Sequence, residues 1–129
     1  MKIFIQAIKF LSLLLIVLVF SSCGARQFNP EQVYADQVIK SDTVWSGRIP
    51  VRGVVVVGRS ATLTIKPGTT VLFEKIDSND DGIGDSEIRV LGRLLAKGTQ
   101  ADPILFQSAA ADPHRKDWSY ILFFTSGQV

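Results

Sequence analysis

Hydrophobic and polar residues alternate along most of the chain beyond residue 44. In residues 61–65, three apolar side chains would face one side of an extended strand while Thr62 and Thr64 face the other. The same period of two recurs in the next apolar segments, so short strands with one buried face are predicted. The positions predicted to face inward are Ala61, Leu63, Ile65, Val71, Phe73, Ile88 and Val90.

Between these segments lie short turns. Pro67 and Gly68 separate two of the predicted strands, since proline fixes φ and glycine accepts a positive φ. The run of four valines at 54–57 is apolar on both faces, which is typical of a strand covered from two sides. No amphipathic helical pattern follows residue 44, so the sequence predicts an all-β fold.

The chain also contains an internal repeat. Leu63-Thr-Ile-Lys-Pro-Gly-Thr69 recurs as Leu94-Leu-Ala-Lys-Gly-Thr99, at an offset of 31 residues from Leu63 to Leu94. A polar insertion of ten residues, 77–86, lies between the copies and leaves 21 residues for the repeating unit. Three strands of about five residues with tight turns fill that length, which is the size of one coil of a solenoid.

These segments, together with residues 90–99, 103–106 and 117–119, resemble the right-handed parallel β-helix repeat family. The resemblance implies a solenoid of two to three coils over residues 43–129. Equivalent inward residues would then stack, Val71 on Ile104 and Phe73 on Phe106. A small antiparallel β-sandwich is the alternative that the alternation alone permits.

The N-terminus has the pattern of an export signal. Lys2 and Lys9 precede an apolar run over residues 10–20, which is shorter than the roughly 20 residues that span a bilayer. Cys23 follows two serines, and this ending resembles a bacterial lipoprotein signal. The resemblance implies a signal helix over residues 1–22, cleavage before Cys23, and a lipid on that thiol. Gly24 after the cysteine implies the outer membrane by the same resemblance.

Residues 23–42 are expected to form a lipidated tether and an N-terminal cap segment. The cap has a pattern that fits either a short helix beginning at Asn29 or an extended strand. Cleavage would remove two lysines and no acids, so the formal charge of +2 becomes 0. A mature chain with no net charge is not expected to bind nucleic acid. Because lipid would occupy the single cysteine, no disulfide is expected either.

The predicted last coil ends in an apolar strand at residues 121–129 with no capping helix or polar layer. A solenoid needs a capped end because an open one exposes strand edges and core side chains. The sequence therefore predicts a C-terminally incomplete solenoid, covered by another copy, by another chain or by a longer form of this protein. Of these, a longer form is favoured.

An acidic loop follows the spacing D-x-N-x-D-G-x-x-D and is similar to calcium loops of the EF-hand and dockerin kind. The expected ligands are the side chains of Asp77, Asn79, Asp81 and Asp85 and the carbonyl of Ile83. The twelfth position holds Ile88, so the usual bidentate acid is missing and only weak calcium binding is expected.

Other candidate chemistry is sparse. Arg89 and Arg93 beside the acidic loop, together with Trp118, are candidate ligand-binding residues. Trp45, Trp118 and Tyr120 are expected to be exposed and could stack on sugars, although tryptophans near coil corners more often seal the core. We expect a noncatalytic binding or structural surface on a lipid-anchored envelope protein, with polysaccharide or another envelope protein as partner. The alternatives are a truncated, polysaccharide lyase-like enzyme, with an arginine as base, and a calcium-dependent adhesion module.

Overall fold

The computed structural model describes residues 32–125 of the chain. The signal segment 1–22, the lipidation residue Cys23 and the first part of the tether lie outside these residues. The described part contains nine strands and no helix, which confirms the all-β prediction. The strands are β1 (Tyr34–Ile39), β2 (Thr43–Trp45), β3 (Arg48–Val57), β4 (Thr62–Ile65), β5 (Thr70–Phe73), β6 (Glu87–Val90), β7 (Arg93–Ala96), β8 (Leu105–Ser108) and β9 (Ile121–Phe123).

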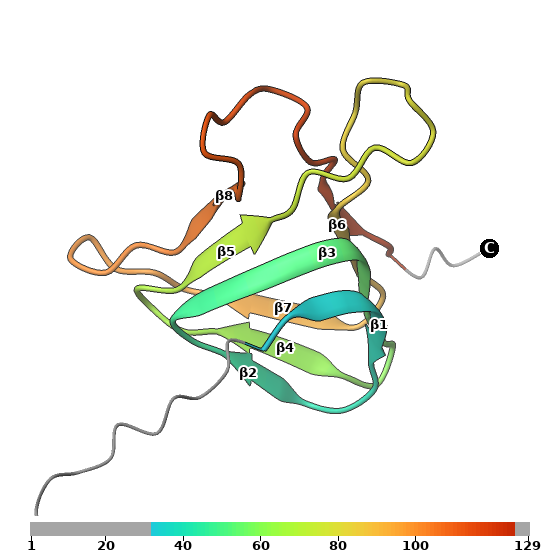
Figure 1. The fold of residues 1–129 in the computed structure, drawn as a ribbon. Coiled ribbons are helices and arrows are strands. Elements are labelled where there is room, and N and C mark those ends of the chain that lie inside the picture. Colours follow the sequence, from blue (N-terminus) through green and yellow to red (C-terminus); the bar gives the residue numbers. More distant parts are fainter. Residues whose placement is uncertain (1–31, 126–129) are drawn as a thin grey trace, which may run out of the picture.

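All strand pairings within the described residues are parallel. One sheet has the order β8-β5-β3-β6-β9, with β1 also paired to β3, and the other has the order β2-β4-β7. The two sheets curl around a shared interior (Figure 1). This arrangement is not the antiparallel sandwich that was the alternative. Each of β7, β8 and β9 pairs with the strand three places earlier in the chain.

β3 is the longest strand and turns a corner in its middle. Residues 48–51 pair with β5, whereas residues 54–57 pair with β6. Gly53 lies between the two halves with a φ of +68°, a conformation that favours glycine. A side chain there would also collide with Asp36, since a Cβ would lie 2.1 Å from Asp36 Oδ1. One continuous strand thereby contributes to two faces of the fold.

A single apolar core fills the interior, and the alternating residues point into it as expected. Leu63, Val71 and Ile88 are fully buried, and the remaining predicted inward positions are at most 2% exposed. Within the valine run, Val55 and Val57 are buried while Val54 and Val56 are half-buried. The period of two therefore predicted the inward face of the strands correctly.

The cap segment forms a strand instead of a helix. β1 lies along β3, with a register shift at Asp36, which has a φ of 35°. The ring of Tyr34 packs on Trp45 with centroids 4.7 Å apart and planes at 52°. Trp45 is fully buried, so it is not an exposed, sugar-stacking aromatic and instead seals the core, which was the alternative for this residue. An indole of this size gains more from burial in the core than from the surface.

The predicted stacking of the two repeat copies is correct in one ladder and wrong in the other. Leu63 pairs with Leu94, as the repeat indicated. Val71 pairs with Phe106, however, and Phe73 pairs with Ser108, so the expected partners are displaced by two residues. The chain after Gly98 forms a turn in which the Asp102 carbonyl accepts hydrogen bonds from Gly68 and Thr99. The extra residues in this turn shift the register of β8.

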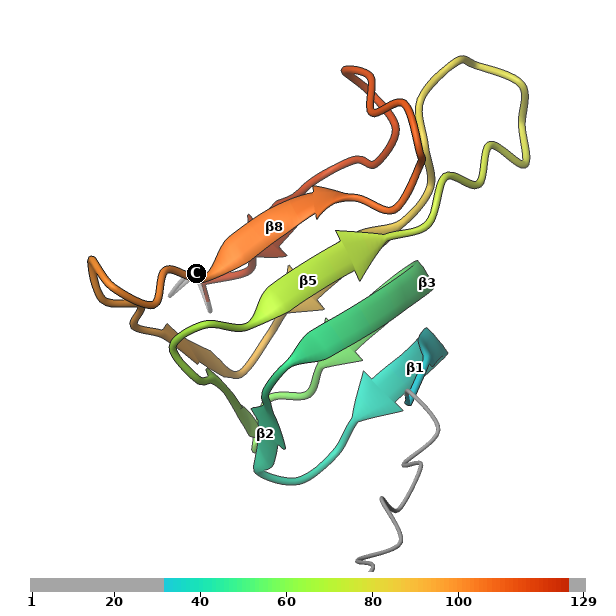
Figure 2. The ribbon, with the colours of Figure 1, turned by 60° about the vertical axis from the view of Figure 1, so that its left-hand side comes forward.

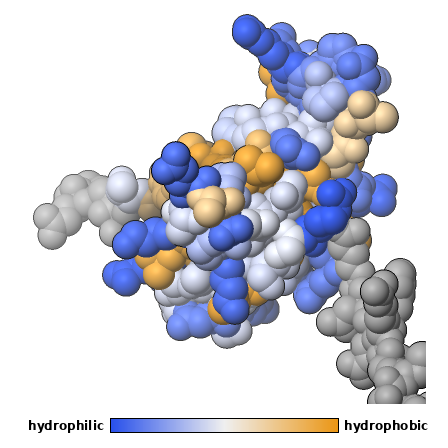
Figure 3. All heavy atoms as spheres, turned by 90° about the vertical axis from the view of Figure 1, so that its left-hand side faces the viewer, coloured by the Kyte–Doolittle hydropathy of each residue, from blue (hydrophilic) through white to orange (hydrophobic). Residues whose placement is uncertain are grey.

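The surface mixes polar and apolar side chains (Figure 3). Several large apolar residues are exposed near the last strands, among them Leu95, Leu105 and Phe123. Within residues 32–125, no helix is long and apolar enough to span a membrane.

Candidate functional site

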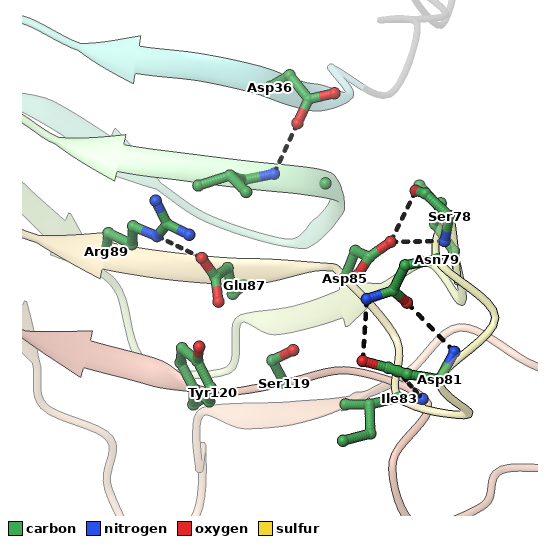
Figure 4. A pocket seen from close by; sticks show the side chains of 13 residues that line it. Asp36, Ser78, Asn79, Asp81, Ile83, Asp85, Glu87, Arg89, Ser119 and Tyr120 are labelled. Atoms are coloured by element: carbon green, nitrogen blue, oxygen red, sulfur yellow. Dashed lines mark hydrogen bonds and ion pairs between the residues drawn. The ribbon is translucent and has the colours of Figure 1, made fainter.

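A cleft of about 520 Å³ opens between the acidic loop and the sheet that contains β1, β3 and β6 (Figure 4). The loop forms one wall, β1 and the middle of β3 form another, and β6 with the segment before β9 completes the cleft. Polar groups dominate its lining. The lining residues are Asp36, Gly53, Val54, Ile76, Ser78, Asn79, Asp81, Ile83, Asp85, Glu87, Arg89, Ser119 and Tyr120.

The acidic loop is shaped by its own side chains, which accept hydrogen bonds from backbone amides. Asp77 accepts from the amides of Asp81 (3.1 Å) and Gly82 (2.9 Å), and Asp81 accepts from the amide of Ile83 (2.8 Å). Short polar side chains commonly stabilise turns in this way. Gly82 takes a φ of +79° at the sharpest point. The D-x-N-x-D-G pattern therefore builds a tight turn.

Asp85 closes the base of the loop. Its Oδ2 atom accepts hydrogen bonds from both the hydroxyl and the amide of Ser78, each at 2.7 Å. Both bonds lower the pKa of Asp85 because they stabilise the carboxylate, and the bond from the Ser78 hydroxyl has the larger effect. Asp85 therefore stays ionised at the edge of the cleft.

The side chains of the predicted calcium ligands make hydrogen bonds within the loop. Both carboxylate oxygens of Asp77 accept loop amides, and the Asn79 amide donates to Asp81 at 3.0 Å. Within residues 32–125, no group of three or more His, Cys, Asp or Glu side chains is placed to hold a metal. Calcium binding by this loop remains a prediction.

An ion pair lies on the β6 side of the cleft. The guanidinium Nε of Arg89 donates to Oε1 of Glu87. The Glu87 side chain is only 5% exposed, whereas that of Arg89 is 45% exposed. A carboxylate this deeply placed requires a cation partner, because an unpaired buried charge is strongly unfavourable.

The sheet side of the cleft also carries Asp36 on β1, two strands away from β6 in the same sheet. Its Oδ1 atom accepts a hydrogen bond of 2.8 Å from the amide of Val54 (Figure 4). The bulge at Asp36 and the absence of a side chain at Gly53 allow this close approach. Asp36 thus faces the cleft from a strand more than 40 residues before the acidic loop in the chain.

Ser119 and Tyr120 line the third side and connect it to the loop. The Ser119 hydroxyl donates to the Gly84 carbonyl at 2.6 Å, and the Tyr120 carbonyl accepts from the Ile88 amide at 3.1 Å. The Tyr120 side chain itself is exposed, at 51%. Its backbone is fixed while its ring is available to a ligand.

A buried carboxylate holds the two long loops together behind the cleft. Asp117 is 1% exposed and accepts hydrogen bonds from the His114 amide and the Ser108 hydroxyl, both at 2.8 Å. Lys75 Nζ, from the segment that enters the acidic loop, lies 3.1 Å from its other oxygen. The amide of His114 and then the hydroxyl of Ser108 lower the pKa of Asp117 to about 2, and Lys75 adds to the effect.

The cleft brings together some of the residues that the sequence predicted as calcium ligands or ligand-binding residues. Asn79, Asp81, Ile83, Asp85 and Arg89 all line the cleft, whereas Asp77 shapes the turn. Two other candidates lie outside its lining. Arg93 is on β7, in the second sheet, and the Trp118 ring stacks on Phe73 with centroids 4.2 Å apart.

No sequence pattern marks Asp36 as a site residue, since it reaches the cleft only through the pairing of β1 with β3. Comparison with known proteins adds no relative: no family model, no curated protein and no solved structure matches this chain. The fold and the site define an all-β protein of parallel sheets with an acidic cleft, whose lining includes the exposed ring of Tyr120.

Proposed function

We propose that the chain is a lipid-anchored protein of the cell envelope, in which a short right-handed parallel β-helix carries a noncatalytic glycan-binding cleft. The ladders β4–β7, β5–β8 and β6–β9 support the β-helix, because each strand pairs in parallel with the third strand before it. Such a periodic pairing is the arrangement that a three-strand coil requires. The apolar segment before Cys23 supports the anchor.

The observation that carries the glycan proposal is the position of Tyr120. Its exposed ring lines the same cleft as the Glu87–Arg89 pair and the carboxylates of Asp36 and Asp85. An aromatic face packs on the apolar face of a sugar ring, and carboxylates accept hydrogen bonds from its hydroxyls. The cleft offers both groups side by side.

The charge of the lining selects the kind of glycan. Four carboxylates, from Asp36, Asp81, Asp85 and Glu87, face one arginine whose guanidinium is already paired. A chain of uronates would bring more negative charge to this cleft, at a cost in repulsion. Neutral or amine-bearing sugars are therefore the proposed ligands.

The state of Arg89 favours binding over catalysis. The lyase alternative uses an arginine as the base that removes a proton. The Nε atom of Arg89 already donates to the Glu87 carboxylate, so this side chain is held by an ion pair and is not directed at a substrate proton. Cleavage of an acidic polysaccharide in the presence of calcium, lost on Arg89→Ala, would favour the enzyme instead.

Calcium enters the proposal only as a weak ligand of the acidic loop. The carboxylates of Asp80, Asp81 and Asp85 lie close in sequence and repel one another, so a cation would relieve part of that repulsion. Because the twelfth position of the loop holds Ile88 instead of a bidentate acid, the affinity is expected near the millimolar range.

The glycan proposal is tested by binding of the full chain, purified in a mild detergent, to immobilised neutral, amine-bearing and uronate-containing polysaccharides. We expect the wild type to bind the neutral and the amine-bearing polysaccharides, and Tyr120→Ala to lose this binding. Leu95→Ala is the matched control, since Leu95 is similarly exposed at 45% but lies on β7 outside the cleft. Unchanged binding by Tyr120→Ala, or preference for uronates, would overturn the proposal.

A further inference from the structure

The sheet side of the cleft carries a row of side chains that crosses four strands. Val54 on β3 pairs with Glu87 on β6. Tyr120 is next in line on the segment that enters β9, where its carbonyl accepts the Ile88 amide. On the other side of β3, Asp36 of β1 accepts the Val54 amide. All four members of the row line the cleft, and Figure 4 shows Asp36, Glu87 and Tyr120 one after another across the strands.

The row follows from the period of two along each strand. Val55 and Ile88 are fully buried in the core. The residues before them, Val54 and Glu87, therefore face away from the core and into the cleft. Parallel neighbouring strands lie about 4.8 Å apart, so a row from β1 through β3 and β6 to the β9 segment is about 14 Å long.

The acidic loop encloses one side of this row. The loop projects from the same side of the stacked strands as the loop before β9 (Figure 2). Its residues Asn79, Asp81 and Ile83 line the cleft and lie beside the row in Figure 4. An extended ligand held between the loop and the sheet would therefore lie along the row, across the strands.

The two carboxylates of the row each have one oxygen engaged. Glu87 Oε1 accepts from Arg89, and Asp36 Oδ1 accepts from the Val54 amide at 2.8 Å. No described residue donates a hydrogen bond to the second oxygen of either side chain. These oxygens are acceptors for the hydroxyl or amine groups of a ligand, while the engaged oxygens keep the carboxylates in place.

The two carboxylates differ in how their charge is balanced. Glu87 is paired with the Arg89 guanidinium, whereas Asp36 forms no ion pair with any residue in the described range 32–125. Asp36 is also exposed, so a ligand can reach it without displacing a protein cation. A ligand ammonium group is therefore best placed at Asp36, at the end of the row away from Tyr120.

We propose that the cleft binds a linear oligosaccharide that lies across the strands, with one sugar ring on Tyr120 and an amine-bearing unit at Asp36. This inference rests on the glycan function proposed above and adds the length, the direction and the selectivity of the ligand. One sugar unit of an extended chain is about as long as one strand spacing, so the row accommodates about three units. Asp36 is then the residue that selects the amine.

The test is calorimetric titration of the full chain, in a mild detergent, with linear oligomers of glucosamine of increasing length. The N-acetylated oligomers of the same lengths are the neutral counterparts. The affinity is expected to rise with length up to about three units and then to level off, because further units lie beyond the row. The glucosamine oligomers should bind more tightly than their neutral counterparts, and added salt should reduce this preference.

Asp36→Asn separates the amine contact from the rest of the cleft. The asparagine oxygen can still accept the Val54 amide, so the fold of this strand pair is retained. Affinity for the glucosamine oligomers is expected to fall about threefold to fivefold, which is the size of an exposed ion pair, with no change for the neutral oligomers. Asp42→Asn is the matched control and should bind like the wild type, because Asp42 accepts the Thr62 amide at 2.8 Å but lies outside the cleft lining.

The outcomes distinguish this inference from the glycan function itself. If the wild type binds the single sugar as tightly as the longer oligomers, or if Asp36→Asn keeps the full preference for glucosamine, the arrangement along the row is overturned and the glycan function stands. An equal loss in Asp42→Asn would likewise remove Asp36 as the selecting residue. If the wild type binds no oligomer of either series, the glycan function fails, and this inference fails with it.

Discussion

The indole of Trp118 stacks on the ring of Phe73, with centroids 4.2 Å apart and planes inclined by 7°. Phe73 is fully buried on β5, and Trp118 belongs to the segment that leads into β9. The contact therefore seals the core where Ser108, the strand partner of Phe73 on β8, is too small to do so. Trp118 serves packing, and its ring is not presented to the cleft.

Trp118→Ala should consequently lower the stability of the fold. Removal of a half-buried indole from a stacked pair is expected to cost about 2 kcal/mol, less than for a fully buried tryptophan. Urea unfolding of the variant and the wild type measures this difference. Tyr120→Ala is the control, since its exposed side chain should cost little stability while glycan binding is lost; equal stability of both variants would contradict the packing role.

The Asp117 carboxylate gives the stability a pH dependence. Its pKa is lowered from 3.8 to about 2 by the His114 amide and the Ser108 hydroxyl, with Lys75 as a further cause. A depressed folded-state pKa means that the stabilisation is complete above pH 4 and is lost as the pH falls towards 2. Asp117→Asn should therefore be less stable than the wild type at neutral pH, and the gap should narrow between pH 4 and pH 2.

Thermal unfolding at a series of pH values follows that gap. Asp42→Asn is the control. Asp42 also accepts a backbone amide, that of Thr62 at 2.8 Å, but its carboxylate is exposed where that of Asp117 is buried. A constant gap between Asp117→Asn and the wild type from pH 7 to pH 2 would show that the carboxylate's charge is not what holds the two loops together.

Calcium should have a small and weak effect. Addition of up to ~10 mM calcium is expected to raise the melting temperature slightly, because it relieves repulsion in the acidic loop, and Asp81→Ala should remove the rise. Magnesium in parallel separates a calcium-specific effect from general screening. An unchanged melting curve would remove calcium from the proposal and leave the glycan cleft untouched.

Cys23 should determine membrane attachment. In a bacterial host that processes lipoproteins, the chain should incorporate a labelled fatty acid and fractionate with membranes, and Cys23→Ala should carry no label. Ser22→Ala is a suitable control, because alanine keeps a small residue before the cysteine. Label that persists in Cys23→Ala would exclude this thiol as the attachment point.

Local patterns in the sequence were sufficient for the strands and their inward faces. Burial of Leu63, Ile65 and Val71 follows from a period of two, which is a property of each short segment by itself. The pairing of Leu63 with Leu94 was also predictable, since both copies of the repeat precede the turn that changes the spacing. The D-x-N-x-D-G spacing indicated a tight acidic loop, but its carboxylates bind backbone amides.

The sequence by itself determined the short strands, the residues that face the core and the position of the acidic loop, because these depend on side chains a few residues apart. Only the tertiary structure decided the register of β8 on β5 and the presence of Asp36 in the cleft lining, on the same sheet as Arg89. Both depend on how distant strands align, which is set by the conformations of the intervening turns and by packing such as that of Trp118 on Phe73.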